Sequence, residues 1–448
     1  MDRLDAVTTM SLPARTAGSL GLYAVFGANL VVVTALFVDA GASANLLITI
    51  GRLAGLWAAL LMAFQLLLIA RIPWLDRRLG MDRLTTWHRW VGFTLVWLLV
   101  GHLVFITFGY ADLEGTGVVS TVVDLAATTT GILRAIVAWL LIMAVGVASA
   151  RYARRKLAYE TWHFIHLYTY LAVLLAFSHQ VYTGQTFVGS DLATGYWWTL
   201  WGVALGAVLF GRVLLPLYFN LKHRLRVAAV VAESPSVVSV YVTGRRLDEL
   251  PARAGQFFLW RFLTRDRWWQ SNPYSLSAAP DGKTLRLTAK ALGEGSAGLF
   301  QLRPGTRVFA EGPYGAFTGM HRRAPNALLI AGGVGITPIR ALLEELRGHV
   351  VVLYRVNSDA DAVLLPELST LAHRRGAVAH LLPGPPDAVS PNGPLLGPHN
   401  IAALVPDVRQ RDVYVCGPPG MTGAVLESLR LLGIPRDQIH AERFALAS

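Results

Sequence analysis

Long apolar runs fill the first half of the chain, and short alternating runs fill the second. An α-helix needs about 20 mostly apolar residues to cross the hydrocarbon core of a bilayer. Six stretches meet this requirement: 17–39, 45–70, 87–109, 128–149, 160–182 and 196–219. The pattern therefore predicts a membrane α-helical bundle of six spans.

From residue 221 onward the pattern is that of a soluble protein. The segments "RVAAVVAESPSVVSVYVTG" and "AGQFFLWRFL" read as short strands with turns, which is typical of an antiparallel β-barrel. Further on, "ALLIAGGVGITPIRALLEEL" and "DVYVCGPPGMTGAVLESLRLLG" each read as a strand followed by a helix. This alternation predicts an α/β domain with a parallel sheet.

Composition agrees with a membrane protein, because 54% of the residues are hydrophobic and only 15% are charged. A net charge of +12 is compatible with nucleic-acid binding, but Lys and Arg cluster at the ends of the apolar runs, as in membrane proteins. We therefore expect a lipid bilayer, and no nucleic acid, as a partner. The single cysteine, Cys416, excludes an intrachain disulfide and a cysteine-ligated iron–sulfur cluster.

Basic residues mark alternate connections between the spans. They follow spans two, four and six: Arg71, Arg77, Arg78 and Arg83; Arg151, Arg154, Arg155 and Lys156; Lys222, Arg224 and Arg226. The remaining connections hold acidic residues and no Lys or Arg. The positive-inside rule then predicts a multi-pass protein of the cell membrane, with both termini and the soluble half in the cytoplasm. No cleavable signal peptide is expected.

Histidines recur in spans three and five. His88 and His102 are fourteen residues apart, so on a helix their imidazoles face one direction with a rise of about 21 Å. Span five is antiparallel to span three and places His166 at the depth of His88, and His179 at the depth of His102. Two stacked bis-histidine sites follow, each suited to a b-type haem. The alternative is a structural role in which the histidines form hydrogen bonds between helices.

Span five has one awkward feature. Thirteen residues separate His166 from His179, which on an ideal helix leaves the two rings about 140° apart. Either span five is distorted, or its rings reach around opposite flanks. A third histidine, His163, lies at the inner edge of the span and is not assigned as a ligand.

Two segments of the predicted barrel carry candidate binding groups. In "NPYSLSAAP", Tyr274 can lie against a ring system, and the Ser275 hydroxyl can reach polar ring or phosphate atoms. In "LTAKALGEGSAGLF", Gly293, Gly295 and Ser296 open a short helix after a strand that carries Lys290. Glycines and a hydroxyl at a helix N-terminus favour a diphosphate site.

The predicted parallel sheet carries a second glycine-rich turn. Gly332, Gly333 and Gly335 permit a pyrophosphate to approach the backbone, and Thr337 and Pro338 fit an N-cap pair in the first turn of the helix. The motif is GxGxxP, which departs from the GxGxxG dinucleotide fingerprint.

A later strand ends with Cys416, Gly417 and Pro418 at the carboxyl edge of the sheet, where ligands of such folds bind. The alternative for Cys416 is a small buried residue. Near the C-terminus, Phe444 either covers a ring system or packs in the core.

These motifs, in this order, resemble the ferric reductase and NADPH oxidase superfamily. The resemblance rests on the four histidines followed by NPYSLSAAP, GEGSAGLF, EGPYG, AGGVGITP, CGPPGM and ERF, and covers about residues 17–446. It implies a cytoplasmic N-terminal segment over 1–16, a haem domain over 17–220, an FAD-binding β-barrel over 221–322 and an NAD(P)-binding α/β domain over 323–448.

The resemblance also implies which residues bind each cofactor. His88 and His166 would hold the inner haem, and His102 and His179 the outer one. The expected flavin contacts are Asn272, Pro273, Tyr274, Ser275, Leu276, Ser277, Lys290, Gly293, Gly295 and Ser296. The expected NADPH or NADH contacts are Gly332, Gly333, Gly335, Thr337, Pro338, Arg355, Gly417 and Pro418. Cys416 would lie near the nicotinamide and Phe444 against the flavin, both as catalytic residues.

Two departures from the family pattern affect these expectations. Asn272 stands where the family commonly has His or Arg. Arg355 lies near the position that recognises the 2′-phosphate, but "YRVNSDAD" does not match the oxidase pattern, so NADPH and NADH both stay open.

The implied function is transfer of electrons from cytoplasmic NAD(P)H through FAD and two haems to an acceptor across the membrane. A ferric chelate and oxygen, which would give superoxide, are both candidate acceptors. One alternative is an electron-delivery subunit that reduces an extracytoplasmic redox partner protein. Another is a membrane protein without redox activity, in which the histidines and glycines are structural.

Overall fold

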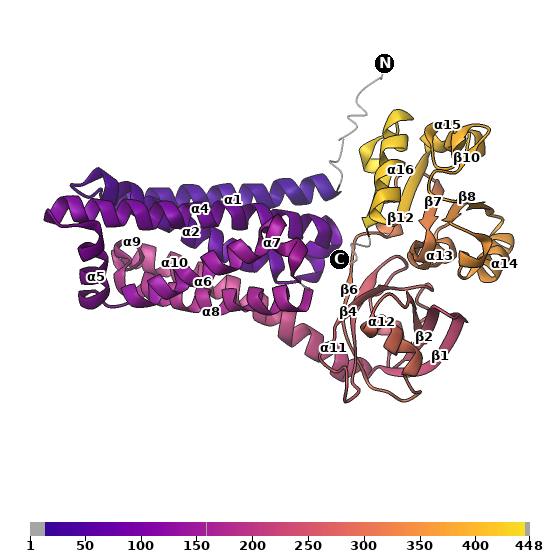
Figure 1. The fold of residues 1–448 in the computed structure, drawn as a ribbon, viewed down its shortest axis with the longest axis horizontal. Helices are drawn as coiled ribbons and strands as arrows, with labels where there is room; N and C mark the ends of the chain where they lie inside the picture. Colours follow the sequence, from indigo (N-terminus) through magenta and orange to yellow (C-terminus); the bar gives the residue numbers. More distant parts are fainter. Residues whose placement is uncertain (1–13, 158, 444–448) are drawn as a thin grey trace, which may run out of the picture. The chain divides into compact units, whose positions relative to one another are not determined.

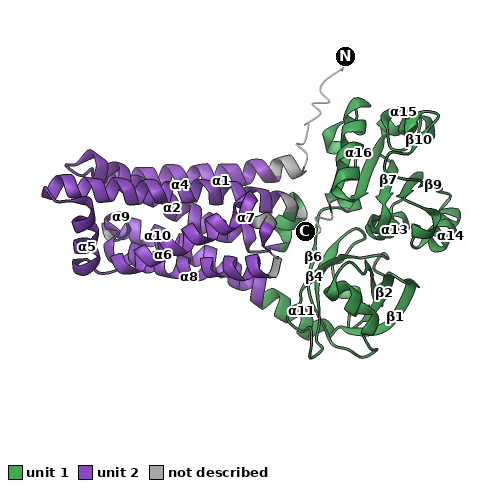
Figure 2. Ribbon diagram, viewed as in Figure 1, with its two compact units in different colours: residues 1–14, 73–81, 214–446 green, residues 15–72, 82–213, 447–448 purple. Residues whose placement is uncertain are grey.

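The structure is a computed structural model that describes residues 14–157 and 159–443. The chain forms two compact units (Figure 2). One is helical and consists of residues 15–72 and 82–213. The other contains the short segment 73–81 and the chain from residue 214 onward, so a connection between two spans belongs to the same unit as the soluble half.

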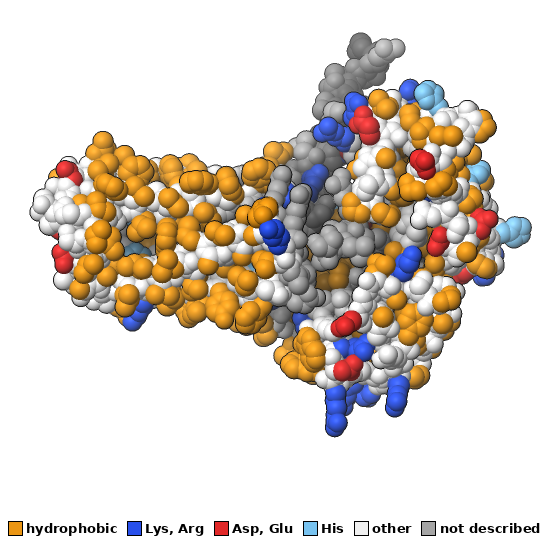
Figure 3. All heavy atoms as spheres, in the orientation of Figure 1, with side chains coloured by type: hydrophobic (Ala, Val, Ile, Leu, Met, Phe, Trp, Pro, Cys, Tyr) orange, Lys and Arg blue, Asp and Glu red, His pale blue; other side chains and the backbone are white. Residues whose placement is uncertain are grey.

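Six helices are long and apolar enough to cross a membrane, which confirms the six predicted spans (Figure 1). They are α1 (Ala14–Asp39), α2 (Leu46–Ile69), α4 (Met81–Glu114), α6 (Ile132–Ser149), α8 (Tyr159–Thr183) and α10 (Asp191–Leu209). Short helices lie in the connections: α3 (Pro73–Leu79), α5 (Val118–Thr128), α7 (Arg151–Lys156) and α9 (Gln185–Val188). Most of the visible surface of this unit is hydrophobic (Figure 3), as a lipid-facing bundle requires.

Helix α2 supplies much of the core of this bundle. Half of its most apolar window is buried, compared with 28% or less for the other spans. Its residues Leu60 and Phe64 belong to a cluster with Trp197 and Trp201 of α10, both almost fully buried. The core of the bundle therefore lies along α2, and α4 and α8 are left largely exposed along their lengths.

The structure answers the question that the spacing in span five raised. Helix α8 is a regular α-helix over Tyr159–Thr183, so no distortion is observed there. The irregular turn lies in span six instead, where a π-helical segment (Phe210–Leu214) joins α10 to α11 (Leu215–His223). In this turn Arg212 Nε donates to the carbonyl of Ile69 at 2.8 Å, and Gly211 packs against the carbonyl of Ala70. The π-turn thus brings a guanidinium to the C-terminus of α2, whose last carbonyls have no partner within the helix.

Two antiparallel sheets follow the bundle. One has the order β1 (Arg226–Ser234), β2 (Val237–Thr243), β5 (Thr284–Lys290), and the other β4 (Asn272–Ser275), β3 (Phe257–Phe262), β6 (Val308–Tyr314). A bridge between Leu276 and Leu287 continues the pairing from β4 to β5. The side chains between the sheets form one core that includes Val238, Trp260 and Leu287. The predicted antiparallel barrel is confirmed.

The last part is a five-stranded parallel sheet, also as predicted. Its order is β13 (Ile439–Arg443), β12 (Arg411–Gly417), β7 (Asn326–Gly332), β8 (Val350–Val356), β9 (Val378–Pro383). Helices α13 (Ile336–Glu345) and α14 (Leu365–Arg375) contribute to one buried cluster, and α15 (Pro398–Leu404) and α16 (Pro419–Leu431) to the other. A small hairpin of β10 (Val389–Ser390) and β11 (Gly393–Pro394) precedes α15. The strand order reverses between β7 and β12, and ligands of such sheets bind at this switch point.

Candidate functional site

The structure brings His88 of α4 and His166 of α8 together. Their ring centroids lie 6.0 Å apart, with the ring planes at 65°. An imidazole nitrogen binds a transition metal at about 2.0 Å, and the ring centroid lies about 1.1 Å further away, so two imidazoles that bound one metal from opposite sides would have centroids about 6 Å apart. The observed separation therefore fits an iron held between the two side chains.

The second pair, His102 of α4 and His179 of α8, is oriented by hydrogen bonds at Nδ1. His102 Nδ1 lies 2.8 Å from the carbonyl oxygen of Gly51, and His179 Nδ1 lies 2.9 Å from Thr183 Oγ1. The Thr183 hydroxyl donates to the His179 carbonyl at 2.8 Å, so it accepts from the ring. Each Nδ1 then carries the proton and each Nε2 is free to bind a metal, as metal-binding histidines require. His179 also lies within electrostatic range of His102.

The His166 ring has a similar support. Ser149 Oγ lies 3.5 Å from His166 Nδ1 and accepts a hydrogen bond from Trp162 Nε1 at 3.1 Å. The Trp162 ring packs against His166 with centroids 5.0 Å apart. Opposite, Gln65 Nε2 donates to the backbone carbonyl of His88 at 2.9 Å. His163 is exposed and stays outside the ligand set.

Two glycines make room for these groups, and sequence reasoning missed them. A Cβ on Gly55 of α2 would lie 2.6 Å from His102 Nδ1, and a Cβ on Gly92 of α4 would lie 2.6 Å from Gln65 Nε2. Small residues on the facing sides of membrane helices are the only signal that points to them. Because α8 is regular, His166 and His179 leave it on different flanks, about 140° apart.

Strand β4 and the residues after it contain the expected flavin contacts. Ser275 is buried and its hydroxyl has no hydrogen bond among the described residues. Burial raises the pKa of Tyr274 to about 12, so the phenol stays neutral. Buried polar groups in native proteins are nearly always paired, so the free Ser275 hydroxyl fits a bound polar ligand. Pro273 is exposed beside it.

Leu276 and Ser277 point into the protein. Leu276 is fully buried in the barrel core. The Ser277 hydroxyl accepts hydrogen bonds from Arg286 Nε at 3.0 Å and from Thr288 Oγ1 at 2.8 Å. In this arrangement Ser277 supports a buried network, and its side chain does not face the other expected flavin contacts.

That network joins the barrel to the parallel-sheet part. Arg286 of β5 contacts Glu367 of α14 at 2.8 Å, and Arg340 of α13 contacts the same carboxylate at 2.6 Å. Glu344 of α13 pairs with Arg340 and accepts from the backbone N–H of Ala279 at 2.7 Å. Buried charges are stable only when they are paired in this way, so the network fixes the barrel against the sheet.

The short helix α12 (Glu294–Ala297) follows the second flavin motif. The Ser296 hydroxyl accepts from the backbone N–H groups of Leu292 and Gly293, at 2.9 and 3.2 Å. Gly295 packs near Asn272, and Lys290 is exposed at the end of β5. With four residues, α12 has few aligned peptides and only a weak dipole.

Gly332 ends β7, and Gly333 and Gly335 follow it. Each position requires glycine for a different reason. Gly333 has φ +52°, which favours glycine, and a Cβ there would meet no atom within 4 Å. A Cβ on Gly332 would overlap the Met421 sulfur, and one on Gly335 would overlap the Cys416 carbonyl. Gly333 thus leaves backbone open to a ligand at the switch point, whereas Gly332 and Gly335 allow β7 and β12 to pack closely.

The expectation that Thr337 and Pro338 form an N-cap pair is wrong. A 3₁₀ turn (Gly333–Gly335) starts the helix earlier, so Gly335 is the N-cap and Thr337 lies inside the first turn. Its hydroxyl donates to the Val334 carbonyl at 3.1 Å.

Arg355 lies at the end of β8 with its guanidinium among backbone carbonyls. Nη1 donates to Gly384 at 2.7 Å and to Leu382 at 3.2 Å, and Nη2 donates to Pro385. Partial burial lowers its pKa. These contacts tie β8 to the loop after β9 and hold the Arg355 guanidinium against backbone carbonyls.

Cys416 is fully buried in β12 within the hydrophobic core. Burial, with a further contribution from nearby Glu442, raises the pKa of its thiol well above the usual value. Gly417 packs against Gly332, and Pro418 is exposed at the carboxyl edge of the sheet. Phe444 lies outside the described residues.

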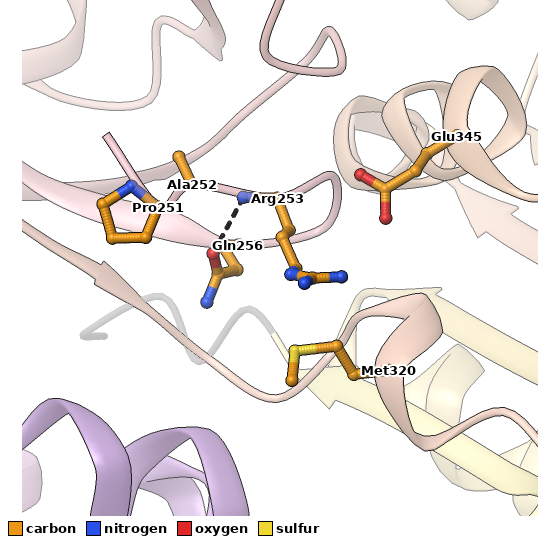
Figure 4. A pocket seen from close by; sticks show the side chains of 6 residues that line it. All are labelled: Pro251, Ala252, Arg253, Gln256, Met320 and Glu345. Carbon is orange, nitrogen blue, oxygen red and sulfur yellow. Dashed lines mark hydrogen bonds between the residues drawn. The ribbon is translucent and has the colours of Figure 1, made fainter. Parts of the chain in front are cut away.

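One pocket of about 340 Å³ is shown in Figure 4. It is lined by Pro251, Ala252, Arg253, Gln256, Met320 and Glu345. The Arg253 side chain extends between Glu345 and Met320, and its backbone N–H donates to Gln256 Oε1 at 2.9 Å. No predicted site residue lines this pocket.

Two family models match the chain, one in each half. Residues 54–177 match the ferric reductase like transmembrane component, and residues 329–427 match the oxidoreductase NAD-binding domain. The first match contains His88, His102 and His166 and ends two residues before His179, and the second contains the glycine-rich turn and Cys416.

Three of the similar proteins each match half of the chain or less. Ferredoxin–NADP reductase B of Sorangium cellulosum is 30% identical over 192 residues, which are 38% of this chain and 77% of the reductase. A flavohemoprotein of Chromobacterium violaceum is 33% identical over 49% of this chain, and the chain spans 59% of its length. Among solved structures, the flavohem-like FAD/NAD binding domain of a Vibrio cholerae nitric oxide dioxygenase is 26% identical, with a TM-score of 0.41, over 50% of this chain and 99% of that domain.

The transmembrane match falls within the apolar part of the chain, and the NAD-binding match falls within the soluble part. The six apolar helices hold the histidine pairs, and the sheets that follow hold the expected flavin and nucleotide contacts. Residues 54–177 are similar to the ferric reductase like transmembrane component, and the soluble half belongs to the ferredoxin–NADP reductase family, with an oxidoreductase NAD-binding domain at residues 329–427.

Proposed function

We propose that the protein takes electrons from cytoplasmic NAD(P)H and delivers them across the membrane through FAD and two b-type haems. The observation that carries this proposal is the pairing of histidines from α4 and α8, with three of the four Nδ1 atoms beside an oxygen that can orient the ring. Histidines that only form hydrogen bonds between helices would not need to lie in pairs, one from each helix, at two depths of the bundle.

The residues have separate roles in this proposal. His88 and His166 would hold the inner haem, and His102 and His179 the outer haem. Ser149, Thr183 and the Gly51 carbonyl hold the Nδ1 protons, which keeps each Nε2 directed at the metal and makes the imidazole a stronger ligand. When bound, the nicotinamide supplies a hydride, the flavin divides its two electrons, and the haems carry one electron each.

The soluble half positions the nicotinamide and flavin. Gly333 opens the backbone at the switch point for the nucleotide pyrophosphate, and Ser275 faces the flavin. The network of Arg286, Glu367 and Arg340 holds the two binding parts in a fixed arrangement, which hydride transfer requires because the reacting atoms must approach to about 3–3.5 Å. Pro418 is exposed at the edge of the sheet beside the proposed nucleotide site, and Cys416 lies buried two residues before it in β12.

The orientation follows from charge. Lys and Arg flank the connections on one side of the membrane, which favours a cytoplasmic soluble half and an outer haem that faces the opposite side. The acceptor there is a ferric chelate or oxygen. An extracytoplasmic redox partner protein is the second candidate, because an exposed haem edge serves either kind of acceptor.

Absorption spectroscopy of the purified chain tests the proposal. We expect two b-type haems per chain, both reduced when NADPH or NADH is added under anaerobic conditions. A preparation that binds no haem would refute the electron-transfer function. With haem present, the yields of superoxide and of ferrous chelate distinguish the two small acceptors, and failure of both points to a protein partner.

A further inference from the structure

We propose that Arg267, in the loop between β3 and β4, is the cation that binds the FAD diphosphate. The inference rests on the proposed function, since it requires FAD to bind at β4 and α12. Asn272 in β4 is uncharged and Lys290 is exposed, so the sequence motifs alone leave the diphosphate without a directed cation.

The Arg267 side chain is held in one orientation by its neighbour. Its Nε and Nη2 donate to Asp266 Oδ2 at 3.0 and 2.7 Å. The remaining nitrogen, Nη1, is buried and has no hydrogen bond among the described residues. Asp266 is 63% exposed, so the pair lies at the surface on the Asp266 side and leaves one guanidinium edge directed inward.

That inward edge lies against the turn after α12. A Cβ on Gly298 would overlap the Arg267 guanidinium, so this position must be glycine for the contact to exist. A Cβ on Gly295 would lie 3.4 Å from Gln270 Oε1 and 3.6 Å from Asn272 Nδ2. The loop over 267–272 therefore runs beside α12, and the guanidinium lies next to the glycine-rich segment.

Two further polar groups in this region are unpaired. Ser271 Oγ and Ser275 Oγ are both buried without a hydrogen bond among the described residues. With Arg267 Nη1, three buried polar groups within nine residues have no partner in the protein. Because native proteins pair nearly all such groups, the cluster indicates a polar ligand with several acceptor oxygens.

Charge favours a diphosphate as that ligand. The α12 helix has four residues and a weak dipole, and the Ser296 hydroxyl is occupied by its own backbone. The Arg267 guanidinium, paired with Asp266 through Nε and Nη2, has an Nη1 without an acceptor among the described residues, and guanidinium N–H groups donate the directed hydrogen bonds that phosphate oxygens accept.

The test is FAD affinity of the full chain in detergent after removal of its flavin, measured from FAD fluorescence. Arg267→Gln should weaken FAD binding on the order of 10- to 100-fold, the loss of one charge-assisted hydrogen-bonded contact. Arg267→Lys should fall between this variant and the wild type. Arg265→Gln, an exposed arginine two residues away, should bind FAD like the wild type.

The salt dependence separates a phosphate contact from a structural role. Wild-type affinity should fall as NaCl rises from about 50 to 500 mM, and Arg267→Gln should lose most of that dependence, because the screened charge is gone. Equal affinity in the wild type and Arg267→Gln, or weaker binding with an unchanged salt dependence, would overturn the role of Arg267 alone. A wild-type chain that takes up no FAD would overturn the proposed function as well.

Discussion

Gly55 of α2 provides the space that the His102 ring of α4 occupies. A Cβ at position 55 would lie 2.6 Å from His102 Nδ1, and the same Nδ1 is bonded to the Gly51 carbonyl one turn away. Helix α2 therefore shapes the surroundings of the proposed outer haem ligand His102, although no histidine of the proposed ligand set belongs to α2.

The first prediction concerns Gly55→Ala. The added methyl should displace the His102 ring and reduce the haem content from two per chain towards one, measured by pyridine haemochrome assay. Gly202→Ala is the matched control in α10, since a Cβ there would meet no atom within 4 Å. Two haems in both variants would show that the His102 ring does not need its present position.

The second prediction concerns His102→Leu. Loss of one axial ligand should remove the outer haem and block electron exit, while the flavin is still reduced by NADPH because the soluble half is unchanged. Haem content, flavin bleaching and acceptor reduction measure the three effects. If the variant kept both haems, the pairing of His102 with His179 would be wrong.

The third prediction concerns Thr183→Val, which removes the oxygen beside His179 Nδ1 without changing side-chain size. The imidazole then becomes a weaker ligand, so outer-haem affinity should fall on the order of 10-fold and the midpoint potential should rise. Redox titration measures the potential. Thr169→Val is the control, because that hydroxyl bonds only to the His166 backbone carbonyl. Equal potentials in the two variants would contradict the role of Thr183.

The fourth prediction concerns Glu367→Gln, which removes the carboxylate shared by Arg286 and Arg340. Without this carboxylate, two buried guanidinium groups lose a shared partner, so the free energy of unfolding of the soluble half should fall by about 2 kcal/mol. Flavin reduction should also become slower. Thermal unfolding and stopped-flow reduction by NADPH measure these effects. Glu427→Gln breaks only an exposed pair with Arg430 and should change neither.

The fifth prediction concerns the pH dependence of stability. Because burial raises the pKa of the Cys416 thiol in the folded protein, its contribution to stability is complete below the unfolded pKa of about 8.5 and declines as the pH rises above it. Between about pH 8.5 and 10 the wild type should therefore lose more thermal stability than Cys416→Ala. Parallel pH profiles would mean that the thiol already ionises freely in the folded state.

The sequence predicted the elements better than the contacts. Hydropathy located all six spans, because lipid requires about 20 apolar residues in each, and strand–helix alternation located the parallel sheet. It missed the charged end of the last span, whose helix continues to His223, where hydropathy has already fallen. Of the two alternatives for span five, a distorted helix is not observed, because α8 is regular. The sequence did not indicate the irregular turn at Phe210–Leu214, because its cause is a contact with the end of α2.

In the candidate site, too, the sequence predicted residue types better than it predicted their contacts. Ser277 and Arg355 have the residue types expected of cofactor contacts, but their partners are Arg286 and the carbonyls after β9, which lie far away in the sequence. Thr337 was misplaced because a 3₁₀ turn begins the helix earlier. Conversely, Gly55 and Arg267 belong to no sequence motif. Their contacts with His102 and Gly298 become visible only in the structure.

The division of each histidine pair between α4 and α8 sets an order for biogenesis. A nascent chain that has inserted its first four spans holds His88 and His102 but no partner for either, because both partners come from the fifth span. In the proposed function, haem loading by both pairs would therefore wait until α8 has entered the bilayer. A chain terminated before Tyr159 would hold only half of each proposed site, so translation would have to pass this point before the proposed holoprotein could form.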